Sequence, residues 1–381
     1  MILYISYATE YNLFNKLLDE GKVYPSNQME KFNSSLIKGL ASYDEVISLS
    51  ALPYKGPAKK TVLKLDNIQY ISIPNITGKL HRLFNVIMLL LFGIFTIIRK
   101  RPRFIICDAI NNSPCYVSAI LAKLFRIPAV AIVTDLPGML GVNRDPAKGI
   151  RRMQQFDGYI LLTEAMQQVV NPKSKPYMIM EGLCSPVIPK TPKNSEGNKS
   201  KKIILYTGAL WKHDAGIEYF VDGFLRAGIK DAELHFYGVG ELVEWLKRIE
   251  KRHPNIKYKG VLPNDKIVEK QLEASLLVNP RPSGEEFCVY SFPSKTMEYM
   301  LSGTPVLMTR LPGVPAEYFD YVYTIDCESS DGVSEVLKEI FSRDSSNISD
   351  LGKKAREFVI NNKSCEKQAK RVFDFCNSIT R

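Results

Sequence analysis

Short apolar runs recur along the first half of the chain, and most of them are separated by segments long enough for a helix. Each run has the length and the apolar character of a strand buried on both faces. Alternation of such strands with helices is typical of a parallel, doubly wound α/β sheet. The predicted strands are Ile2–Ala8, Glu45–Ser50, Ile68–Ile73, Phe104–Cys107, Ala129–Thr134, Gly158–Leu162 and Tyr177–Met180.

The same alternation resumes after a segment rich in Pro, Lys, Ser and Asn, so the 381 residues are expected to form two domains. Residues 186–201 are the predicted linker between an α/β domain over 1–185 and a second over 202–362. A C-terminal helix is expected over 363–381, and its return to the first domain is left open. Two such domains create a cleft, in which we expect the chemistry. The predicted strands of the second domain are Lys202–Tyr206, Glu233–Tyr237, Ile256–Lys259, Leu276–Val278, Pro305–Met308 and Tyr321–Thr324.

The formal net charge of +11 is distributed unevenly. Over positions 1–185, Lys and Arg clearly outnumber Asp and Glu, whereas the two kinds nearly balance over the remainder. A basic surface of this kind suits an anionic membrane, a lipid-phosphate substrate or nucleic acid. No zinc-finger, RNP-type or helix-turn-helix signature accompanies the charge, so we expect an anionic membrane surface as a partner and no nucleic acid.

The seven cysteines are scattered without a C-x-x-C pair, which is typical of the reduced thiols of a cytoplasmic protein. The first residues lack the basic region of a secretory signal. The longest apolar run extends from Val86 to Ile98 and is followed by the basic segment Arg99–Arg103. A bilayer span takes about 20 residues, so this run is expected to be too short to cross. Two interpretations stay open, a buried crossover helix and an interfacial helix whose basic end meets phospholipid headgroups.

The stretch Arg281–Pro315 has the pattern of a ligand-binding loop between two strands. Pro293 and Ser294 predict the start of a helix, with apolar residues at helical spacing behind them. A helix N-terminus beyond a strand's carboxyl end offers free N–H groups to an anion, so a phosphate-bearing ligand is expected. Lys295 could neutralise the phosphate, and Glu298 could accept sugar hydroxyls. Ordinary capping by Ser294 is an equally good explanation of this pattern.

Loops after other strands of the second half are expected on the same rim. Gly208 permits close approach of a ligand to the backbone, and Lys212 or His213 could touch a phosphate. Gly238 belongs to only half of a G-x-G-x-x-G fingerprint, for which an ordinary tight turn is the simpler explanation. The candidate binding residues of these loops are Gly208, Lys212, His213, Gly238 and Val261, while Arg281 and Glu286 stand ahead of Ser294 in the stretch Arg281–Pro315 and add to the same rim.

Several catalytic motifs do not occur in the sequence. We find no Walker A motif, no D-x-D pair, no H-E-x-x-H and no G-x-S-x-G, which disfavours ATPase, metalloprotease and serine-hydrolase activities. The four histidines show no ligand spacing, so we expect no metal site and no cofactor. In the first half, Asp108, Asp135 and Glu164 fall at or just after the ends of predicted strands, and this position makes them candidates.

The second half resembles the family-4 glycosyltransferases of GT-B fold, especially those of bacterial capsule, O-antigen and exopolysaccharide synthesis. The resemblance rests on SFPSKTMEYMLSGTPVL, and on YTGALWKHDAGIEYFVDGF, HFYGVGELVEWL, IKYKGVLP and EFVINNKSCEKQAKRV. It implies two Rossmann-like domains, with a nucleotide-sugar donor held by the second domain and an acceptor held mainly by the first. It also implies retention of anomeric configuration without a metal.

The resemblance implies roles for individual residues. Glu298 matches the glutamate that binds the nucleotide ribose, Ser294 and Lys295 match the diphosphate site, Gly208 matches the glycine-rich donor loop, and Val261 lies where the base is met. Three positions depart from the family pattern. Tyr290 stands in place of the first glutamate of the E-x7-E motif, so Glu286 is the candidate to replace it. Ala209 stands in place of an arginine, and Asp135 stands where many relatives have a histidine.

The function expected from these residues and this resemblance is sugar transfer from an NDP-sugar, expected to be a UDP-sugar, to a polyprenyl-diphosphate-linked saccharide. Asp135 and Glu286 are the candidate catalytic residues. The enzyme is expected to be cytoplasmic and peripheral on the inner face of the cell membrane. Alternatives are a sugar-nucleotide epimerase of the same fold, or a membrane-associated scaffold whose donor site has decayed.

Overall fold

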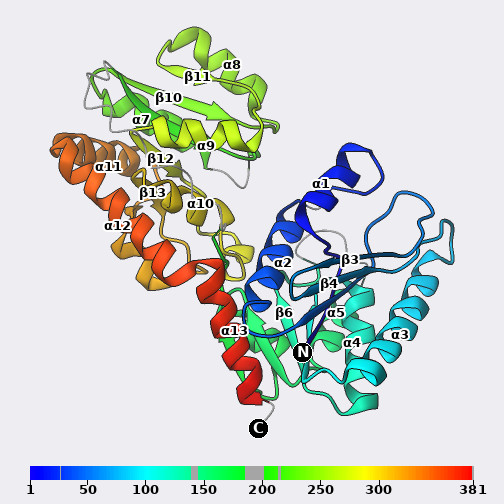
Figure 1. Ribbon diagram of the computed structural model, residues 1–381. Helices are drawn as coiled ribbons and strands as arrows, with labels where there is room; N and C mark the ends of the chain where they lie inside the picture. Colours follow the sequence, from blue (N-terminus) through cyan, green and yellow to red (C-terminus); the bar gives the residue numbers. More distant parts are fainter. Residues whose placement is uncertain (26, 139–144, 185–200, 213–215, 380–381) are drawn as a thin grey trace. The chain divides into compact units, whose positions relative to one another are not determined.

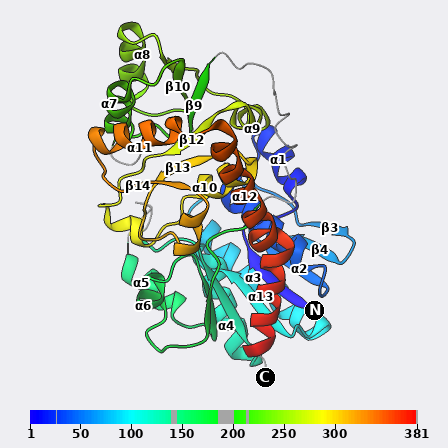
Figure 2. The same ribbon diagram turned by 90° about the vertical axis from the view of Figure 1, so that its left-hand side faces the viewer.

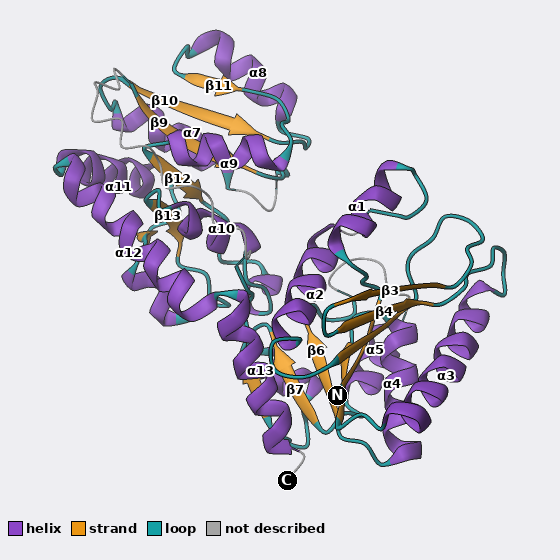
Figure 3. Cartoon of the chain, viewed as in Figure 1, coloured by secondary structure: helices purple, strands orange, loops and turns teal. Residues whose placement is uncertain are grey.

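The fold is taken from a computed structural model that describes residues 1–381 except 26, 139–144, 185–200, 213–215 and 380–381. The chain divides into two compact units (Figures 1 and 2). The first unit comprises Met1–Pro186 and Ser364–Arg381, and the second comprises Val187–Lys363. In both units strands alternate with helices (Figure 3). The predicted linker 186–201 lies outside the described residues except for its last position.

The first unit contains an eight-stranded sheet in the order β3-β4-β2-β1-β5-β6-β7-β8. All neighbouring strands are parallel except β3 and β4, which are antiparallel. The parallel sheet confirms the sequence prediction, with strand ends shifted by one or two residues. Its strands are β1 Ile2–Ser6, β2 Val46–Ser50, β3 Thr61–Leu65, β4 Ile68–Ser72, β5 Phe104–Asp108, β6 Ala129–Val133, β7 Gly158–Leu161 and β8 Tyr177–Ile179.

Helices cover both faces of this sheet. The helices α2 and α13 pack against each other on one face, while α3 and α4 pack on the other (Figure 1). A β-carbon on Gly39 of α2 would lie 2.6 Å from the side chain of Ala369, so these two helices are in close contact. The helices of the first unit are α1 Tyr11–Asp19, α2 Asn27–Leu40, α3 His81–Lys100, α4 Asn112–Phe125, α5 Pro146–Met153, α6 Met166–Val170 and α13 Cys365–Ile379.

The crossover helix α3 corrects the expectation drawn from the apolar run 86–98. The helix is 20 residues long, because it begins well before that run and includes Arg99 and Lys100. Among the described residues it is the one helix that is long and apolar enough to cross a membrane by length and composition. Only 28% of its most apolar 18-residue window is buried, so the interpretation as a buried crossover helix is wrong for one of its faces.

The second unit contains a six-stranded parallel sheet in the order β11-β10-β9-β12-β13-β14. Apolar residues of α7, α8 and α11 form a core on one face of this sheet. On the opposite face, α10 packs against α9 and α12. The strands are β9 Lys202–Thr207, β10 Ala232–Tyr237, β11 Ile256–Tyr258, β12 Leu276–Asn279, β13 Val306–Thr309 and β14 Tyr323–Ile325. The helices are α7 Ile217–Ala227, α8 Val243–Arg252, α9 Asn264–Glu273, η1 Glu286–Val289, α10 Ser294–Ser302, η2 Ala316–Asp320, α11 Ser330–Ser342 and α12 Ser345–Lys363.

Candidate functional site

The strand order of the second unit fixes where a ligand can bind. From β9 the chain proceeds to β10 and β11 on one side, and it then returns to β12, β13 and β14 on the other. The direction of winding therefore reverses between β9 and β12, and ligands of open α/β sheets bind at the carboxyl ends of the strands at such a point. Gly208 follows β9 directly, and Arg281 lies just beyond the end of β12.

Two glycines allow neighbouring loops to meet at this edge. Gly208 has a φ of 135° and Gly238 a φ of 146°, a backbone conformation that side chains disfavour. A β-carbon on Gly238 would lie 1.7 Å from the carbonyl oxygen of Gly208. A β-carbon on Gly208 would lie 2.7 Å from the Nζ atom of Lys295. The loop after β9 is therefore held between the loop after β10 and the amine of Lys295.

The contact between Gly238 and Gly208 predicts a specific loss of stability. We expect Gly238→Ala to lower the free energy of unfolding by about 3–5 kcal/mol, because backbone must move to admit the methyl group. Gly228→Ala is the matched control, since Gly228 also has a positive φ but no atom within 4 Å of a new β-carbon. That control is expected to lose about 1–2 kcal/mol. Urea unfolding is followed by the fluorescence of Trp211 and Trp245, which both lie in the second unit. Equal losses in the two variants would contradict the close approach of the loops.

Lys295 lies at the centre of the candidate site. Its Nζ atom donates a hydrogen bond to the Tyr206 hydroxyl at 2.9 Å and lies 4.2 Å from the centroid of that ring. The Tyr206 hydroxyl in turn donates to the carbonyl oxygen of Ala209 at 2.6 Å. Burial of the ammonium group lowers the pKa of Lys295 to about 7, with a further lowering by Arg281 that Glu298 opposes. A cation enclosed in this way gains from a bound anion, because the anion replaces its lost hydration.

Glu298 is held one turn further along α10 by residues that the sequence analysis did not identify. Its carboxylate accepts a hydrogen bond from the side-chain amide of Gln271 at 2.7 Å. The Tyr299 hydroxyl accepts a hydrogen bond from the backbone N–H of Thr207 at 2.9 Å, which connects α10 to the end of β9. Gln271 and Tyr299 are fully buried, so this network is part of the packed interior. A fixed, half-buried carboxylate beside Lys295 is suited to accept hydroxyl groups of a ligand.

The N-terminus of α10 corrects one detail of the sequence prediction. The helix begins at Ser294 as predicted, but Pro293 occupies the cap position and no side chain caps the helix. Ser294 is exposed in the first turn and does not bond the backbone N–H groups as a cap would. The Thr296 N–H donates to the Pro293 carbonyl oxygen at 2.9 Å, whereas the N–H groups of Ser294 and Lys295 have no intrahelical partner and are available to an anion beside the Lys295 side chain. Arg281, whose guanidinium lies 4.4 Å from the centroid of the Phe287 ring, adds positive charge.

The other predicted residues of this unit lie on the loops around the same edge. Val261 is 63% exposed. In the same loop, the carbonyl oxygen of Gly260 accepts a hydrogen bond from the backbone N–H of Gly238. Lys212 is exposed, and its backbone N–H donates to the Glu241 carboxylate at 2.7 Å. Glu286 is exposed at the start of η1, and among the described residues its carboxylate forms no hydrogen bond or ion pair with Lys295 or Arg281. His213 lies outside the described residues.

A second cluster of polar residues lies at the carboxyl ends of β1 and β5, where the winding of the first sheet reverses. Asp108, the last residue of β5, accepts hydrogen bonds from Asn33 and Asn111 at 3.0 Å each. Burial raises the pKa of Asp108 to about 6, and burial likewise raises the pKa of Asp135 to about 6. Carboxyl groups with such pKa values are suited to take up a proton near neutral pH. Asp135 lies two residues beyond the end of β6, the strand beside β5, and its charge contributes to the raised pKa of Asp108, so both carboxyl groups lie at the edge where a ligand of the first unit would bind.

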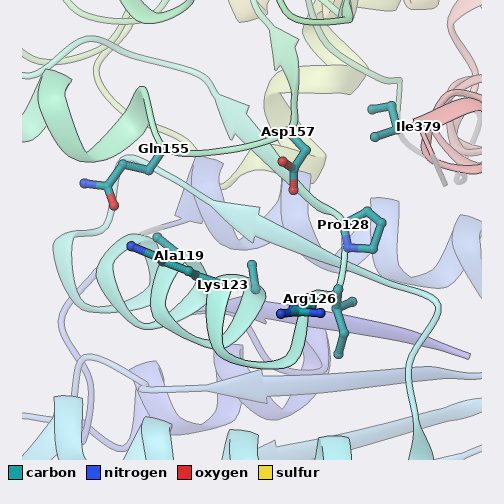
Figure 4. Close-up of a pocket in the computed structure, with 9 residues that line it drawn as sticks. Ala119, Lys123, Arg126, Pro128, Gln155, Asp157 and Ile379 are labelled. Atoms are coloured by element: carbon teal, nitrogen blue, oxygen red, sulfur yellow. The ribbon is translucent and has the colours of Figure 1, made fainter.

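A cavity of about 500 Å³ lies at the opposite edge of the first sheet (Figure 4). It contains none of the predicted site residues, and the strands beside it begin there rather than end. Its lining residues are Ala119, Ala122, Lys123, Arg126, Ile127, Pro128, Gln155, Asp157 and Ile379. Within the described ranges, no group of three or more His, Cys, Asp or Glu side chains is placed to hold a metal ion.

Comparisons with known proteins bear on the second unit and on the fold. Residues 201–339 match a family model described as "Glycosyl transferases group 1". This range includes Gly208, Arg281, Lys295 and Glu298. A search of the curated proteins finds no match.

Solved structures share the fold over almost the whole chain. The chain is similar to sucrose-phosphate synthase from Thermosynechococcus elongatus, with 14% identity, a TM-score of 0.66 and 99% of both chains covered. It is similar to a trehalose-6-phosphate synthase studied for glycosyl transfer with retention, with 9% identity, a TM-score of 0.69 and 99% of both chains covered. It is also similar to HepE from Anabaena in complex with UDP and glucose, with 13% identity, a TM-score of 0.58 and 99% of both chains covered.

At these identities the likeness to solved structures shows the fold alone. Two parallel-rich α/β sheets and these neighbours confirm the prediction of a GT-B fold with two Rossmann-like domains. The family match over the second unit confirms the predicted enzyme class. The protein is a glycosyltransferase of GT-B fold, and its residues 201–339 match the group 1 glycosyltransferases.

Proposed function

We propose that this glycosyltransferase moves a sugar from a UDP-sugar to a hydroxyl of a polyprenyl-diphosphate-linked saccharide during synthesis of a capsule, O-antigen or exopolysaccharide. The observation that carries the donor assignment is the pairing of Lys295 and Glu298 one turn apart on α10, against the Gly208 loop. HepE, which shares the fold, was solved with UDP and glucose, and this supports a uridine nucleotide. The family-4 type of the enzyme rests on the sequence resemblance.

In this proposal the donor diphosphate binds between Lys295, Arg281 and the free N–H groups at the start of α10. Glu298 accepts the ribose hydroxyls, and the backbone around Val261 meets the base. During transfer the bond between the anomeric carbon and the diphosphate oxygen breaks, and negative charge develops on the leaving group. Fixed cations and helix N–H groups stabilise that charge, and the partly buried amine of Lys295 is one such cation.

We propose further that transfer proceeds with retention and without a metal. The acceptor hydroxyl would attack the anomeric carbon on the face from which the diphosphate departs, and a diphosphate oxygen would take the hydroxyl proton. Such a reaction needs no protein base, although the pKa of about 6 for Asp135 suits one. Glu286 is the proposed contact to the donor sugar. The trehalose-6-phosphate synthase of the same fold, which acts with retention, supports the stereochemistry.

The proposed location is the cytoplasmic face of the cell membrane, where a lipid-linked acceptor is available. The excess of basic residues over positions 1–185 supports this location, because anionic headgroups attract such a surface.

The experiment that tests the proposed function is a thermal-shift screen of UDP-, ADP- and GDP-sugars, followed by assays with polyprenyl-diphosphate-linked saccharides. We expect a UDP-sugar at 100 times its Kd to stabilise the protein by about 2.7 kcal/mol, because the ligand binds the native state alone. NMR of the product is expected to show the same anomeric configuration as the donor. If no NDP-sugar binds, the scaffold alternative holds. If the donor alone is converted to an isomer, the epimerase alternative holds.

A further inference from the structure

The outer face of α3 is apolar along its whole length. At 100° per residue, the exposed apolar side chains of this helix and of its cap residue Leu80 fall within an arc of about 120°. Their exposed fractions range from 43% to 66%, and among the described residues no helix or strand of the first unit lies over them (Figures 1 and 3). We call this set the α3 stripe, and it consists of Leu80, Leu83, Ile87, Leu91, Phe95 and Ile98.

The inner face of α3 is more polar than the outer one, which is the reverse of an ordinary helix of a soluble domain. The side buried against the domain includes Asn85, Gly93 and Thr96 together with Leu89 and Ile97. Gly93 lets α3 lie close to α4, because a β-carbon there would be 2.5 Å from the Leu121 side chain. A helix that packs Gly, Asn and Thr inward and, together with its cap residue, directs six large apolar side chains outward is suited to a second apolar environment on its outer side.

The connections of α3 exclude a transmembrane orientation within the folded domain. Both β4, which precedes the helix, and β5, which follows it, belong to the same sheet, and α3 packs on β2 and α4. The helix therefore lies along the surface of the first unit from one end to the other. A helix in this position can only lie in the plane of a membrane interface, with its apolar side chains among the acyl chains.

The charges around the stripe favour an anionic lipid surface over a second copy of the chain. Helix α3 contains no Asp or Glu, and Arg82, Arg99 and Lys100 are exposed on it, followed by exposed Arg101. Lys100 pairs with Glu45 at 3.2 Å, but among the described residues no acidic group pairs with Arg99 or Arg101. The Arg99 guanidinium lies 5.8 Å from the centroid of the Phe95 ring, so the basic end adjoins the stripe. Two copies meeting through this face would bring like charges together, whereas anionic headgroups neutralise them.

We propose that the α3 stripe is a membrane-docking surface that inserts into the interface of an anionic bilayer, with Arg99 and Arg101 at the headgroups. The surface deepens the proposed function, since it would bring the first unit to the membrane that holds the lipid-linked acceptor. Its evidence is independent of the donor site, and so is its test.

The test is co-sedimentation of the full chain with two kinds of vesicle, one of phosphatidylcholine alone and one of two parts phosphatidylcholine to one part phosphatidylglycerol. The second composition is chosen to resemble an anionic membrane. We expect binding to the anionic vesicles that weakens with salt, and much weaker binding to the neutral ones. Phe95→Glu is expected to lower the partition coefficient at least tenfold, because a carboxylate would have to enter the apolar interface. Arg99→Gln with Arg101→Gln is expected to lower it roughly 30-fold on anionic vesicles only.

Tyr24→Glu is the matched control for Phe95→Glu. Tyr24 is 58% exposed and Phe95 is 60% exposed, both are aromatic residues of the first unit, and both changes add one negative charge. The control is expected to bind vesicles as the unchanged protein does. UDP-sugar binding is measured on every variant, so failure of the docking surface and failure of the proposed function are distinguishable.

Three outcomes would overturn the proposal. The first is equal loss of vesicle binding in Phe95→Glu and Tyr24→Glu, which would indicate a general charge effect. The second is a folded protein that binds neither kind of vesicle. The third is a dimer in sedimentation velocity that Phe95→Glu dissociates while vesicle binding is absent, which would assign the stripe to contact between copies.

Discussion

Lys295→Met lowers kcat/KM for sugar transfer by about 10²–10³-fold in our expectation, because it removes the enclosed cation nearest the proposed diphosphate position. The methionine side chain keeps most of the apolar stem that packs on the Tyr206 ring, so the second unit should stay folded. Lys266→Met is the matched control, since Lys266 lies on α9 and forms an exposed ion pair with Glu269. Steady-state kinetics of the two variants with one UDP-sugar and one acceptor give the comparison.

The lowered pKa of Lys295 also predicts how donor binding depends on pH. The pKa of Lys295 is about 7 in the free protein, so below pH 7 the amine is already charged when the donor arrives. Above pH 7 a proton must be taken up on binding, and the Kd for a UDP-sugar is expected to rise by up to tenfold per pH unit. Calorimetry at pH 8 in buffers of different ionisation enthalpy measures this uptake. In Lys295→Met the uptake should vanish, and its persistence there would assign the proton to another group.

Glu298→Ala abolishes detectable transfer in our expectation and raises the Kd for UDP by about 10–100-fold, because it removes a charged acceptor for the ribose hydroxyls. The fold should survive, since the Gln271 amide that loses its carboxylate partner still lies 3.4 Å from the Thr207 hydroxyl. Glu269→Ala on the exposed side of α9 is the control and should change neither quantity.

A ligand lacking the ribose hydroxyls makes the Glu298 assignment sharper. Replacing UDP with 2′,3′-dideoxy-UDP should weaken binding to the unchanged protein about as much as Glu298→Ala does. The two changes together should cost little more than either one, because they remove the same hydrogen bonds. Additive losses would show that Glu298 acts elsewhere, and turnover at the unchanged rate in Glu298→Ala would remove the donor-site proposal.

The sequence was sufficient to predict the two parallel sheets, because strands buried on both faces are continuous apolar runs. The edge strand β3 was missed because it is not a continuous apolar run. Its residues Thr61–Leu65 are mostly exposed, and Lys64 interrupts the apolar pattern. The length of α3 was underestimated because charged residues at both ends of a helix do not count in an apolar run, although they continue its hydrogen-bonding pattern.

At the candidate site, the sequence predicted which loops meet at one edge but not how their side chains are held. Strand order places Gly208, Arg281 and Lys295 together, and strand order can be inferred from a doubly wound pattern. The hydrogen bonds that hold Lys295, Glu298 and their helix in place involve the side chains of Tyr206, Gln271 and Tyr299. These three residues are buried and belong to three different elements. Contacts between residues so far apart in the sequence leave no local pattern, so they had to come from the structure.

The packing of α13 has a consequence for the order in which the protein folds during synthesis. Ala369, Val372 and Cys376 complete the core formed by α2 and the first sheet, although they lie at the opposite end of the sequence from the first strand. That core cannot be completed until α13, which follows the second unit in the sequence, has left the ribosome. All strands of the second unit leave the ribosome before α13 does. The second unit should therefore complete its core before the first unit, although most of the first unit is synthesised earlier.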